Sequence, residues 1–454
     1  MYRSLSHMLG EFAAGADAAR LPPAAVAAAR RCFLDWLGSA IAGSASAPGR
    51  IMLAVVEALG GHPQATLVPV GLRLPVTGAA LYNGAVSHVV ELDDVHRESI
   101  MHPGAAVIPA ALAAAEMVGA TGREFMAAVV AGYEVAIRVA EAVTPSHYRY
   151  WHTTATCGTF GAAAASAKLL GLDGEGIASA LGSAGTQAAG LWEFIADGAM
   201  SKHLHPGKAA MNGVLSALLA REGFSAASRI LEGEKGFFRA TAATFDESRV
   251  GEGLGESFKI TGVSFKVHAS CRHTHPAVDA ALEVVRRHRP DPAAVSSVLV
   301  HTYSVALDVA GNPRPASVYS AKFSLPFCVA LAICRGRAGP GEFSTGALED
   351  PDIKGVMERV QVVVNPAFDA VYPTRWPARV TVRMNDGSEL TGETHHPRGD
   401  PENPLGTDEL EEKFRALVVP VVGDTAAEGL IERARSLESV ADMGELMSCF
   451  GHQA

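Results

Sequence analysis

The chain has 454 residues, of which 48% are hydrophobic and only 19% are charged, and its formal net charge is −10. This length suggests roughly two to three domains, and the excess of 48 acidic over 38 basic residues argues against a nucleic-acid-binding protein. Because charged residues are scarce, we expect part of the surface to be buried in a subunit interface, most simply in a homodimer.

The cysteines and the N-terminal segment bear on the cellular compartment in which the protein is expected. Six cysteines are scattered without a CxxC pair, which favours reduced thiols in a cytoplasmic protein. The first residues include Glu11 and Asp17 and lack the long apolar run of a signal peptide. The most apolar run, residues 104–120, contains Pro109 and Glu116. It predicts a buried helix and no membrane span, since a span needs about 20 mostly apolar residues.

Helix follows helix in the first half of the chain. Pro22 and Pro23 precede a long apolar run that ends near Gly43, as expected where Pro begins a helix and Gly follows its end. Further helices are predicted over residues 78–92, 104–118, 122–143, 159–170, 173–189 and 209–222. Ala, Gly and Ser dominate these segments, and this predicts a closely packed helical core.

The segment 200–213 is basic and has no carboxylate. Within seven residues it contains four basic side chains, Lys202, His203, His205 and Lys208. Pro206 and Gly207 predict a turn that leads into a helix, where backbone N–H groups can also face an anion. Alone, the segment fits a solvated turn as well as an anion site.

The pattern changes near Ser257. Residues 258–267 alternate and are β-rich, strands are predicted at 295–305, 360–364 and 378–384, and helices at 276–287 and 321–334. The sequence Asn-Asp-Gly at 385–387 predicts a hairpin. Helical patterns return at 408–417, 426–436 and 438–448, and we expect these helices to pack on the first domain.

The predicted fold is mainly α, with a smaller α+β domain. The large, discontinuous helical domain comprises residues 1–260 and 400–454, and an α+β lid domain comprises residues 261–399. The sequence shows no internal repeat.

Titratable side chains occur among apolar or small neighbours in five segments: residues 88–96, 101–104, 148–159, 200–213 and 266–275. Charged groups are seldom buried without partners, so the acidic group at 91–94 is expected to meet the Lys and His of the other segments. Such burial would perturb several pKa values, as in an acid/base site. Each segment taken singly also fits a surface loop, a helix cap or a satisfied core histidine.

Two other kinds of chemistry are considered. A metal site could use the pairs His203/His205 and His273/His275, placed on strand faces, with Asp93 or Asp94. Nearby lysines would repel a cation, and we predict no metal. Cys271, followed by Arg272 and His273, could be a thiolate nucleophile, but a small packing cysteine fits better. The chain has no GxGxxG between a strand and a helix, no GxxxxGK[ST] and no GxSxG.

Together the segments resemble the MmgE/PrpD family, which includes 2-methylcitrate dehydratase, cis-aconitate decarboxylase and iminodisuccinate epimerase. Similar pieces run along the chain, among them GAVSHVVELDDVHRESIMHPGA, HTTATCGTFGAAAASAKLLGLD, SKHLHPGKAAMNG, FKVHASCRHTHPAVDAA and GDPENPLGTDELEEKF. The resemblance implies a site in the cleft between the helical domain and the lid, a homodimer and no organic cofactor.

The resemblance also implies roles for individual residues. The catalytic residues that it suggests are Asp93, His102, His152, Lys202 and His275. The resemblance also points to Asp94 and Arg272 as substrate-binding residues, and we add Tyr148, Tyr150 and His273 of the same polar segments as substrate-binding candidates. Lys202 and Arg272 suit the binding of carboxylates, and the histidines suit proton transfer near neutral pH.

The chain departs from the family pattern at two places. Val95 stands where dehydratase and decarboxylase members often have Thr, and Ala310 and Gly311 stand where decarboxylases have tyrosines. The typical 2-methylcitrate dehydratases lack the KxLHxG segment and the His152 feature of this chain, which therefore looks nearer to the epimerase and decarboxylase-like branch.

The resemblance implies a cofactor-independent lyase that forms a carbanion next to a carboxylate of a small di- or tricarboxylate, by dehydration or decarboxylation. The alternative is an epimerase of iminodisuccinate or a similar amino or imino dicarboxylate. In that reaction Tyr148 or Tyr150 would deliver a proton to the opposite face. A metallohydrolase fits less well.

Overall fold

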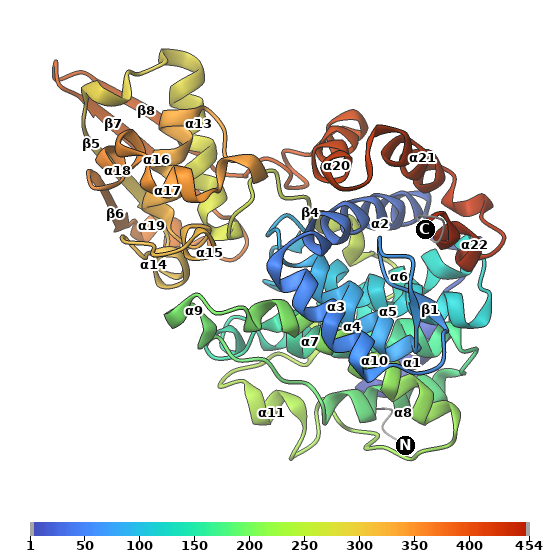
Figure 1. The fold of residues 1–454 in the computed structure, drawn as a ribbon. Helices are drawn as coiled ribbons and strands as arrows, with labels where there is room; N and C mark the ends of the chain where they lie inside the picture. The colour runs from blue at the N-terminus through green and yellow to red at the C-terminus, as the bar shows by residue number, and fades with distance from the viewer. Residues whose placement is uncertain (1–3, 451–454) are drawn as a thin grey trace.

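The computed structural model describes residues 4–450 and shows a large helical lobe and a smaller lobe that contains a sheet (Figure 1). The predicted fold class is therefore confirmed. The outer ends of the predicted helical domain, residues 1 and 454, lie outside the described residues.

The longer helices of the large lobe are α1 (Leu5–Gly15), α2 (Pro23–Ser44), α3 (Ala47–Leu59), α4 (Val76–Ser87), α5 (Pro103–Val118), α6 (Gly122–Val143), α7 (Thr153–Leu169), α8 (Gly174–Gly185) and α10 (Ser201–Arg221). The short helices α9 (Phe194–Asp197), α11 (Phe237–Thr241) and α12 (Ser248–Gly251) connect or flank them. Two small antiparallel ladders complete the lobe, β1 (Ala65–Thr66) with β2 (Arg73–Leu74) and β3 (Val95–His96) with β4 (Val263–Ser264).

Helices α5, α6 and α7 form the centre of the large lobe and are buried along most of their length. Their small residues allow the close approach that the sequence predicts. A Cβ added to Gly161 of α7 would lie 2.5 Å from the Gly132 carbonyl oxygen of α6, so any larger residue would force these helices apart. A capping box between Thr121 and Glu124 starts α6 where the sequence predicts its start.

The predicted turn at Pro206 and Gly207 is wrong. Both residues lie inside α10, which begins eight residues before the predicted start at 209. Gly207 packs so tightly on α4 that an added Cβ would lie 2.3 Å from the Leu81 carbonyl oxygen. The contact between α4 and α10 therefore outweighs the local tendency of Pro-Gly to break a helix.

The small lobe contains a mixed four-stranded sheet in the order β6-β5-β7-β8, formed by β5 (Val295–Thr302), β6 (Val360–Val364), β7 (Ala378–Met384) and β8 (Glu389–Thr394). Strand β5 runs parallel to β6 and antiparallel to β7, and the predicted hairpin joins β7 to β8. Helix α13 (His275–His288) packs on β7 and β8, and α16 (Leu325–Arg335) packs on β6. The remaining helices of this lobe are α14 (Ser304–Ala310), α15 (Val318–Ala321), α17 (Thr345–Glu349), α18 (Pro351–Met357) and α19 (Pro366–Asp369).

Two predicted elements of this half differ from the structure. Residues 258–267 form one turn of 3₁₀ helix, Lys259–Gly262, and only the two-residue strand β4. The helix predicted over 321–334 begins only at Leu325, as α16, because Ser324 caps its start and Pro326 follows.

The C-terminal helices return to the large lobe, as expected. Helix α20 (Thr407–Val422) packs on α2 and on α21 (Asp424–Arg435), and α22 (Met443–Met447) packs on α5 (Figure 1). The predicted helix at 438–448 is shorter than expected, because turns of 3₁₀ helix flank α22 on both sides. The precise domain boundaries stay a prediction.

Over the described residues 4–450, no single helix is both long and apolar enough to cross a membrane. Helices α2 and α3 reach that length and hydropathy only as a pair, and the chain bends by 87° between them.

Candidate active site

A small cavity lies where the two lobes meet. It is lined by Glu91, Val95, Ile100, His102, Tyr148, His152, Trp192 and Lys202 of the large lobe and by Cys271, Arg272, His273, Phe323 and Trp376 of the small lobe. Its volume of about 20 Å³ leaves room for roughly one water molecule, so the site is closed around its polar groups. Six of the ten residues predicted for the site line this cavity: His102, Tyr148, His152, Lys202, Arg272 and His273.

Two lining residues have unusual backbones. Glu91 has φ 59° and Ile100 has φ 48°, and both values lie in the left-handed region that residues other than glycine seldom adopt. Each such residue costs about 1–3 kcal/mol, and strained residues of this kind cluster at functional sites. Their position on one cavity wall supports a functional reading of that wall.

Buried lysines surround Glu91. Lys202 donates a 2.6 Å hydrogen bond to Glu91 Oε1, and Lys266 donates one of 3.4 Å to Oε2. Burial alone would raise the pKa of Glu91, but the charges of the two lysines outweigh it and hold the pKa well below its usual range. One carboxylate thus faces two ammonium groups, and the cluster keeps an excess of positive charge beside the cavity.

Asp93 supports two histidines from behind the cavity. Its Oδ2 lies 2.7 Å from His88 Nδ1 and 3.2 Å from His102 Nδ1. His102 Nδ1 is also 2.7 Å from the Asp94 carbonyl oxygen, which only accepts hydrogen bonds, so Nδ1 bears the proton. The other ring nitrogen of His102, Nε2, is then free to accept a proton. Burial raises the pKa of Asp93, but both histidines outweigh it and keep this pKa well below its usual range.

His152 and His205 form a second histidine pair. Their Nδ1 atoms lie 3.0 Å apart, so one ring donates to the other. Burial, together with the charges of neighbouring groups, lowers the pKa of His152 far below its usual value and that of His205 to about 4. Both rings are therefore neutral near pH 7. Trp192 covers His152 edge-on at a centroid distance of 4.8 Å.

Arg272 extends into the cavity from the small lobe, and three neighbouring groups hold its side chain in place. Its guanidinium contacts Asp400, donates to the Arg398 carbonyl oxygen at 3.2 Å, and donates to His275 Nδ1 at 2.9 Å. His275, predicted to be catalytic, does not line the cavity. Its Nε2 lies 3.3 Å from the Ser270 carbonyl oxygen, which places this ring behind Arg272 as a support.

Aromatic rings close the cavity on the small-lobe side. His273 stacks on Trp376 at 4.4 Å and 9°, and its Nδ1 lies 2.8 Å from the Tyr303 hydroxyl. Burial, reinforced by nearby cationic groups, lowers the pKa of His273 to about 3. Tyr148 lines the cavity 6.3 Å from the His273 ring, whereas Tyr150 is 60% exposed and lies outside it.

Asp94 is buried in the large lobe and does not line the cavity. Its Oδ1 accepts from the Gly104 amide at 3.0 Å, and its Oδ2 accepts from the Tyr133 hydroxyl at 2.7 Å. Burial, aided by the charge of Asp35, raises the pKa of Asp94 to about 7. These contacts tie the loop before α5 to α6; the predicted substrate contact of Asp94 stays a prediction.

Several residues that line the cavity or contact Glu91 were not predicted from the sequence. Lys266 was noted only as part of its segment, although a lysine in an apolar, β-rich stretch is itself a signal of a buried charge. No sequence motif marks the positions of Trp192, Phe323 and Trp376. The Tyr319 hydroxyl lies 3.4 Å from Glu91 Oε1. In the sequence, Tyr319 lies in a segment that resembles the start of an ordinary helix.

The structure does not bring together the histidine pairs of the metal alternative. Among the described residues, the side chains close enough to share an ion are His88, Asp93 and His102 in one group and His396, Asp400 and Glu402 in another. Neither group contains a member of the pairs His203/His205 and His273/His275. His203 and His205 lie on α10, where residues two apart do not face each other.

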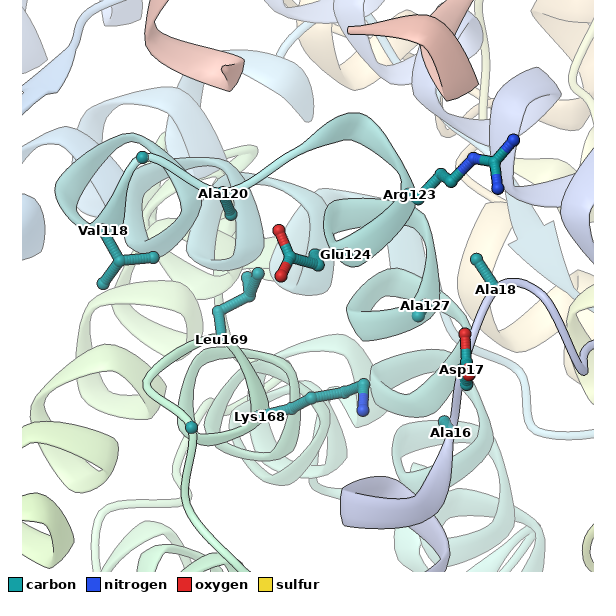
Figure 2. Close-up of a pocket in the computed structure, with 12 residues that line it drawn as sticks. Ala16, Asp17, Ala18, Val118, Ala120, Arg123, Glu124, Ala127, Lys168 and Leu169 are labelled. Carbon is teal, nitrogen blue, oxygen red and sulfur yellow. The ribbon is translucent and has the colours of Figure 1, made fainter. Parts of the chain in front are cut away.

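A larger hollow of about 490 Å³ lies elsewhere on the large lobe, between α1, α6 and α7 (Figure 2). Two of its charged side chains already bond to neighbouring groups. Lys168 donates to the Ala14 carbonyl oxygen at 3.3 Å, and the Glu124 carboxylate belongs to the capping box of α6. Figure 2 shows Arg123 pointing away from both. This hollow therefore lacks the convergent polar groups of the cavity between the lobes.

Residues 7–249 match the family model of the MmgE/PrpD N-terminal domain, and residues 268–439 match that of the C-terminal domain. The chain belongs to the MmgE/PrpD family. Among similar proteins is the cis-aconitate decarboxylase-like protein oryM of Aspergillus oryzae, 28% identical over 94% of this chain and 93% of that protein. The cis-aconitate decarboxylase of Aspergillus terreus is 29% identical over 84% of this chain and 82% of its own length. The human cis-aconitate decarboxylase is 25% identical over 98% and 94%.

Proposed function

We propose that this member of the family is a lyase that acts on a small polycarboxylate, with decarboxylation of cis-aconitate or a close analogue as the first candidate reaction. The observation that carries the proposal is the cavity itself, in which Lys202 and Arg272 flank His102, a histidine with one nitrogen free for proton transfer. The names of the related proteins support the choice of decarboxylation.

The charges of the site suit a carboxylate-rich substrate. Lys202 and Lys266 exceed the single charge of Glu91, and Arg272 presents a planar guanidinium that can bind a carboxylate through two hydrogen bonds. Such groups act strongly in a site that excludes water, because the local dielectric is low. One carboxylate of the substrate would balance the single positive charge in excess around Glu91, and Arg272, whose charge Asp400 already offsets, could hydrogen-bond a second carboxylate.

The proton chemistry follows from the histidines. In decarboxylation the bond to the departing carboxylate breaks, carbon dioxide leaves, and the electron pair stays on the neighbouring carbon. The nearby cations stabilise that carbanion, and a protonated side chain quenches it. His102 is our first candidate for this step: its Nε2 would take up a proton from solvent before the reaction and give it to the carbanion. Asp93 orients the ring as a carboxylate orients a catalytic histidine. His152 and His273 are neutral near pH 7 and can serve as hydrogen-bond partners.

Epimerisation remains the second candidate, because Tyr148 lines the cavity and burial keeps its hydroxyl protonated by raising its pKa well above the usual value. A neutral phenol in the cavity could give the second proton that epimerisation needs. Iminodisuccinate is the test substrate for this reaction.

The decisive experiment is an NMR assay in D₂O with cis-aconitate, 2-methylcitrate and iminodisuccinate. We expect one of these acids to be consumed, with loss of carbon dioxide and deuterium at the new C–H bond. Loss of water or deuterium exchange without net change would identify dehydration or epimerisation. If micromolar protein neither consumes any of these acids nor exchanges a proton of any of them, the proposal is wrong.

A further inference from the structure

A lysine of the small lobe holds the unusual turn at Glu91. Lys322 lies between α15 and α16, and its Nζ donates a 3.0 Å hydrogen bond to the carbonyl oxygen of Val90, the residue before Glu91. Glu91 has φ 59°, a conformation that a residue other than glycine keeps only when its surroundings support it. The turn follows the end of α4, so this hydrogen bond joins the small lobe to the large lobe.

The neighbours of Lys322 in the chain contact the same group of charges. The Tyr319 hydroxyl lies 3.4 Å from Glu91 Oε1, and the ring of Phe323 lies 4.7 Å from Lys202 Nζ. Tyr319 thus approaches the carboxylate of Glu91, and Phe323 approaches its ammonium partner. Lys322 instead bonds the backbone of the turn, which sets the direction in which the Glu91 side chain leaves the chain.

The side chain of Lys322 is a cation near pH 7. Burial, reinforced by the charges of Lys266 and Lys202 and opposed by that of Glu91, lowers its pKa to about 8. The other titratable groups around it are His203, Cys271, Tyr319 and Cys328. Burial lowers the pKa of His203 to about 3 and raises the pKa values of the phenol and both thiols, so all four are uncharged near pH 7. The ammonium form of Lys322 donates a stronger hydrogen bond to the Val90 carbonyl than a neutral amine would.

We propose that Lys322 is a positioning residue: through the Val90 carbonyl it fixes the turn that places the Glu91 carboxylate between Lys202 and Lys266, and so sets where these two ammonium groups meet a substrate carboxylate. The inference rests on the proposed function, because it assigns a role in binding the same class of acid. Since Lys322 and Val90 belong to different lobes, the turn has this support only when the lobes are closed.

The Lys322→Met variant removes the donor and keeps an unbranched apolar chain beside the ring of Phe343, which lies 5.9 Å from Nζ. The probe is tricarballylate, a saturated tricarboxylate, and its Kd is measured by calorimetry. We expect binding to weaken by about tenfold or more, the size of a hydrogen bond from a charged donor. In the NMR assay KM should rise by a similar factor while kcat changes little, because the lysines bind substrate and transition state alike.

Lys354→Met is the matched control, because Lys354 is an exposed lysine of α18 in the same lobe. It should leave the Kd and KM unchanged. An equal loss of affinity in Lys354→Met and Lys322→Met overturns the proposal, since the loss then reflects only the net charge. Wild-type affinity in Lys322→Met also overturns it.

The Glu91→Gln variant shows whether Lys322 acts through Glu91. Glutamine keeps the shape of the side chain and removes the charge whose position the turn fixes. Adding Lys322→Met to this variant should therefore weaken binding by less than about threefold. A loss as large as that in the wild-type background would show that Lys322 acts independently of Glu91, and the proposal would be wrong.

The pH dependence tests the role without relying on a substitution that folds. The affinity of the wild-type protein should fall between about pH 7 and about pH 9, as Lys322 loses its proton, and Lys322→Met should lack this fall. A constant wild-type affinity, or the same fall in Lys322→Met, overturns the proposal. If tricarballylate binds with the expected differences but no acid is turned over, the proposed reaction fails and the role of Lys322 stands. If the wild-type protein does not bind tricarballylate at millimolar concentration, both proposals are wrong.

Discussion

Lys202 is the single side chain on which the proposed chemistry depends most. It is 3% exposed, bonds Glu91 and lines the cavity. Lys202→Met and His152→Ala should each lower turnover by about a hundredfold or more, the size of a lost acid/base or charge contribution. Lys208→Met is the matched control, because Lys208 lies on the same helix but donates to the Gln187 and Ala189 carbonyl oxygens away from the cavity. Steady-state kinetics with near-normal rates for both site variants would refute the assignment.

Asp94 provides a pH-dependent prediction. Its pKa of about 7 in the folded chain, against a usual 3.8, means that the folded state holds a proton that the unfolded state has released. The stability gained is fully present below about pH 4 and is lost as the pH rises to about 7. Asp94→Asn keeps the shape without the charge. Urea unfolding should therefore show this variant gaining on the wild type between about pH 5 and about pH 8. A difference that does not vary with pH would contradict it.

The sequence predicts the polar segments of the site better than the part each residue plays. His102, His152, Lys202 and Arg272 stand out because charge is rare among their apolar neighbours, and all four line the cavity. Asp93 and Asp94 are adjacent in the chain, yet one faces the histidines and the other faces Gly104 and Tyr133. That difference comes from tertiary packing, which no local pattern encodes.

At the scale of elements, the helices with explicit start signals are the best predicted. Helix α6 begins at its capping box, and β6 and β7 match their predicted bounds. Helix α7 begins at Thr153, six residues before the prediction, because its first turns are rich in Thr, and Thr favours a helix weakly. Burial of nearly the whole helix compensates for this weak propensity.

The contact between α4 and α10 is sensitive to a single added methyl group. Gly207→Ala would place a Cβ 2.3 Å from the Leu81 carbonyl oxygen, and we expect a loss of about 1–3 kcal/mol in unfolding free energy. Gly429→Ala is the matched control, since Gly429 lies in α21 with no atom near an added Cβ. This second change should stabilise the protein by about 0.5–1 kcal/mol. Chemical denaturation that shows equal effects would contradict the packing argument.

At the scale of the whole molecule, the predicted homodimer has a candidate surface. On α3, Ile51, Val55 and Leu59 recur every fourth residue and are 53%, 47% and 72% exposed. An apolar stripe of this kind is typical of a protein interface. Sedimentation should give about twice the chain mass of 47.2 kDa, and Val55→Glu should shift the species towards the monomer. A monomeric wild type at micromolar concentration would exclude the dimer.

Asp400 links the two lobes at the site. It accepts from Arg97 of the large lobe at 3.1 Å, contacts Arg272 of the small lobe, and is 2% exposed. Because the closed cavity leaves room for only about one water, the lobes or their side chains must part to admit a polycarboxylate and close again around it.

Asp400→Asn should weaken that closure. The change removes the carboxylate partner of the buried Arg272 guanidinium and one of the two carboxylate partners of the half-buried Arg97, so we expect a loss of about 3–5 kcal/mol in unfolding free energy. We also expect a rise in KM larger than the fall in kcat, since Arg272 would lose its orientation towards the substrate carboxylate. Glu402→Gln is the control, because it removes only the outer partner of Arg97, at 2.8 Å. Equal kinetics for the two variants would show that Asp400 supports the fold alone, whereas a selective rise in KM would tie the junction of the lobes to substrate binding.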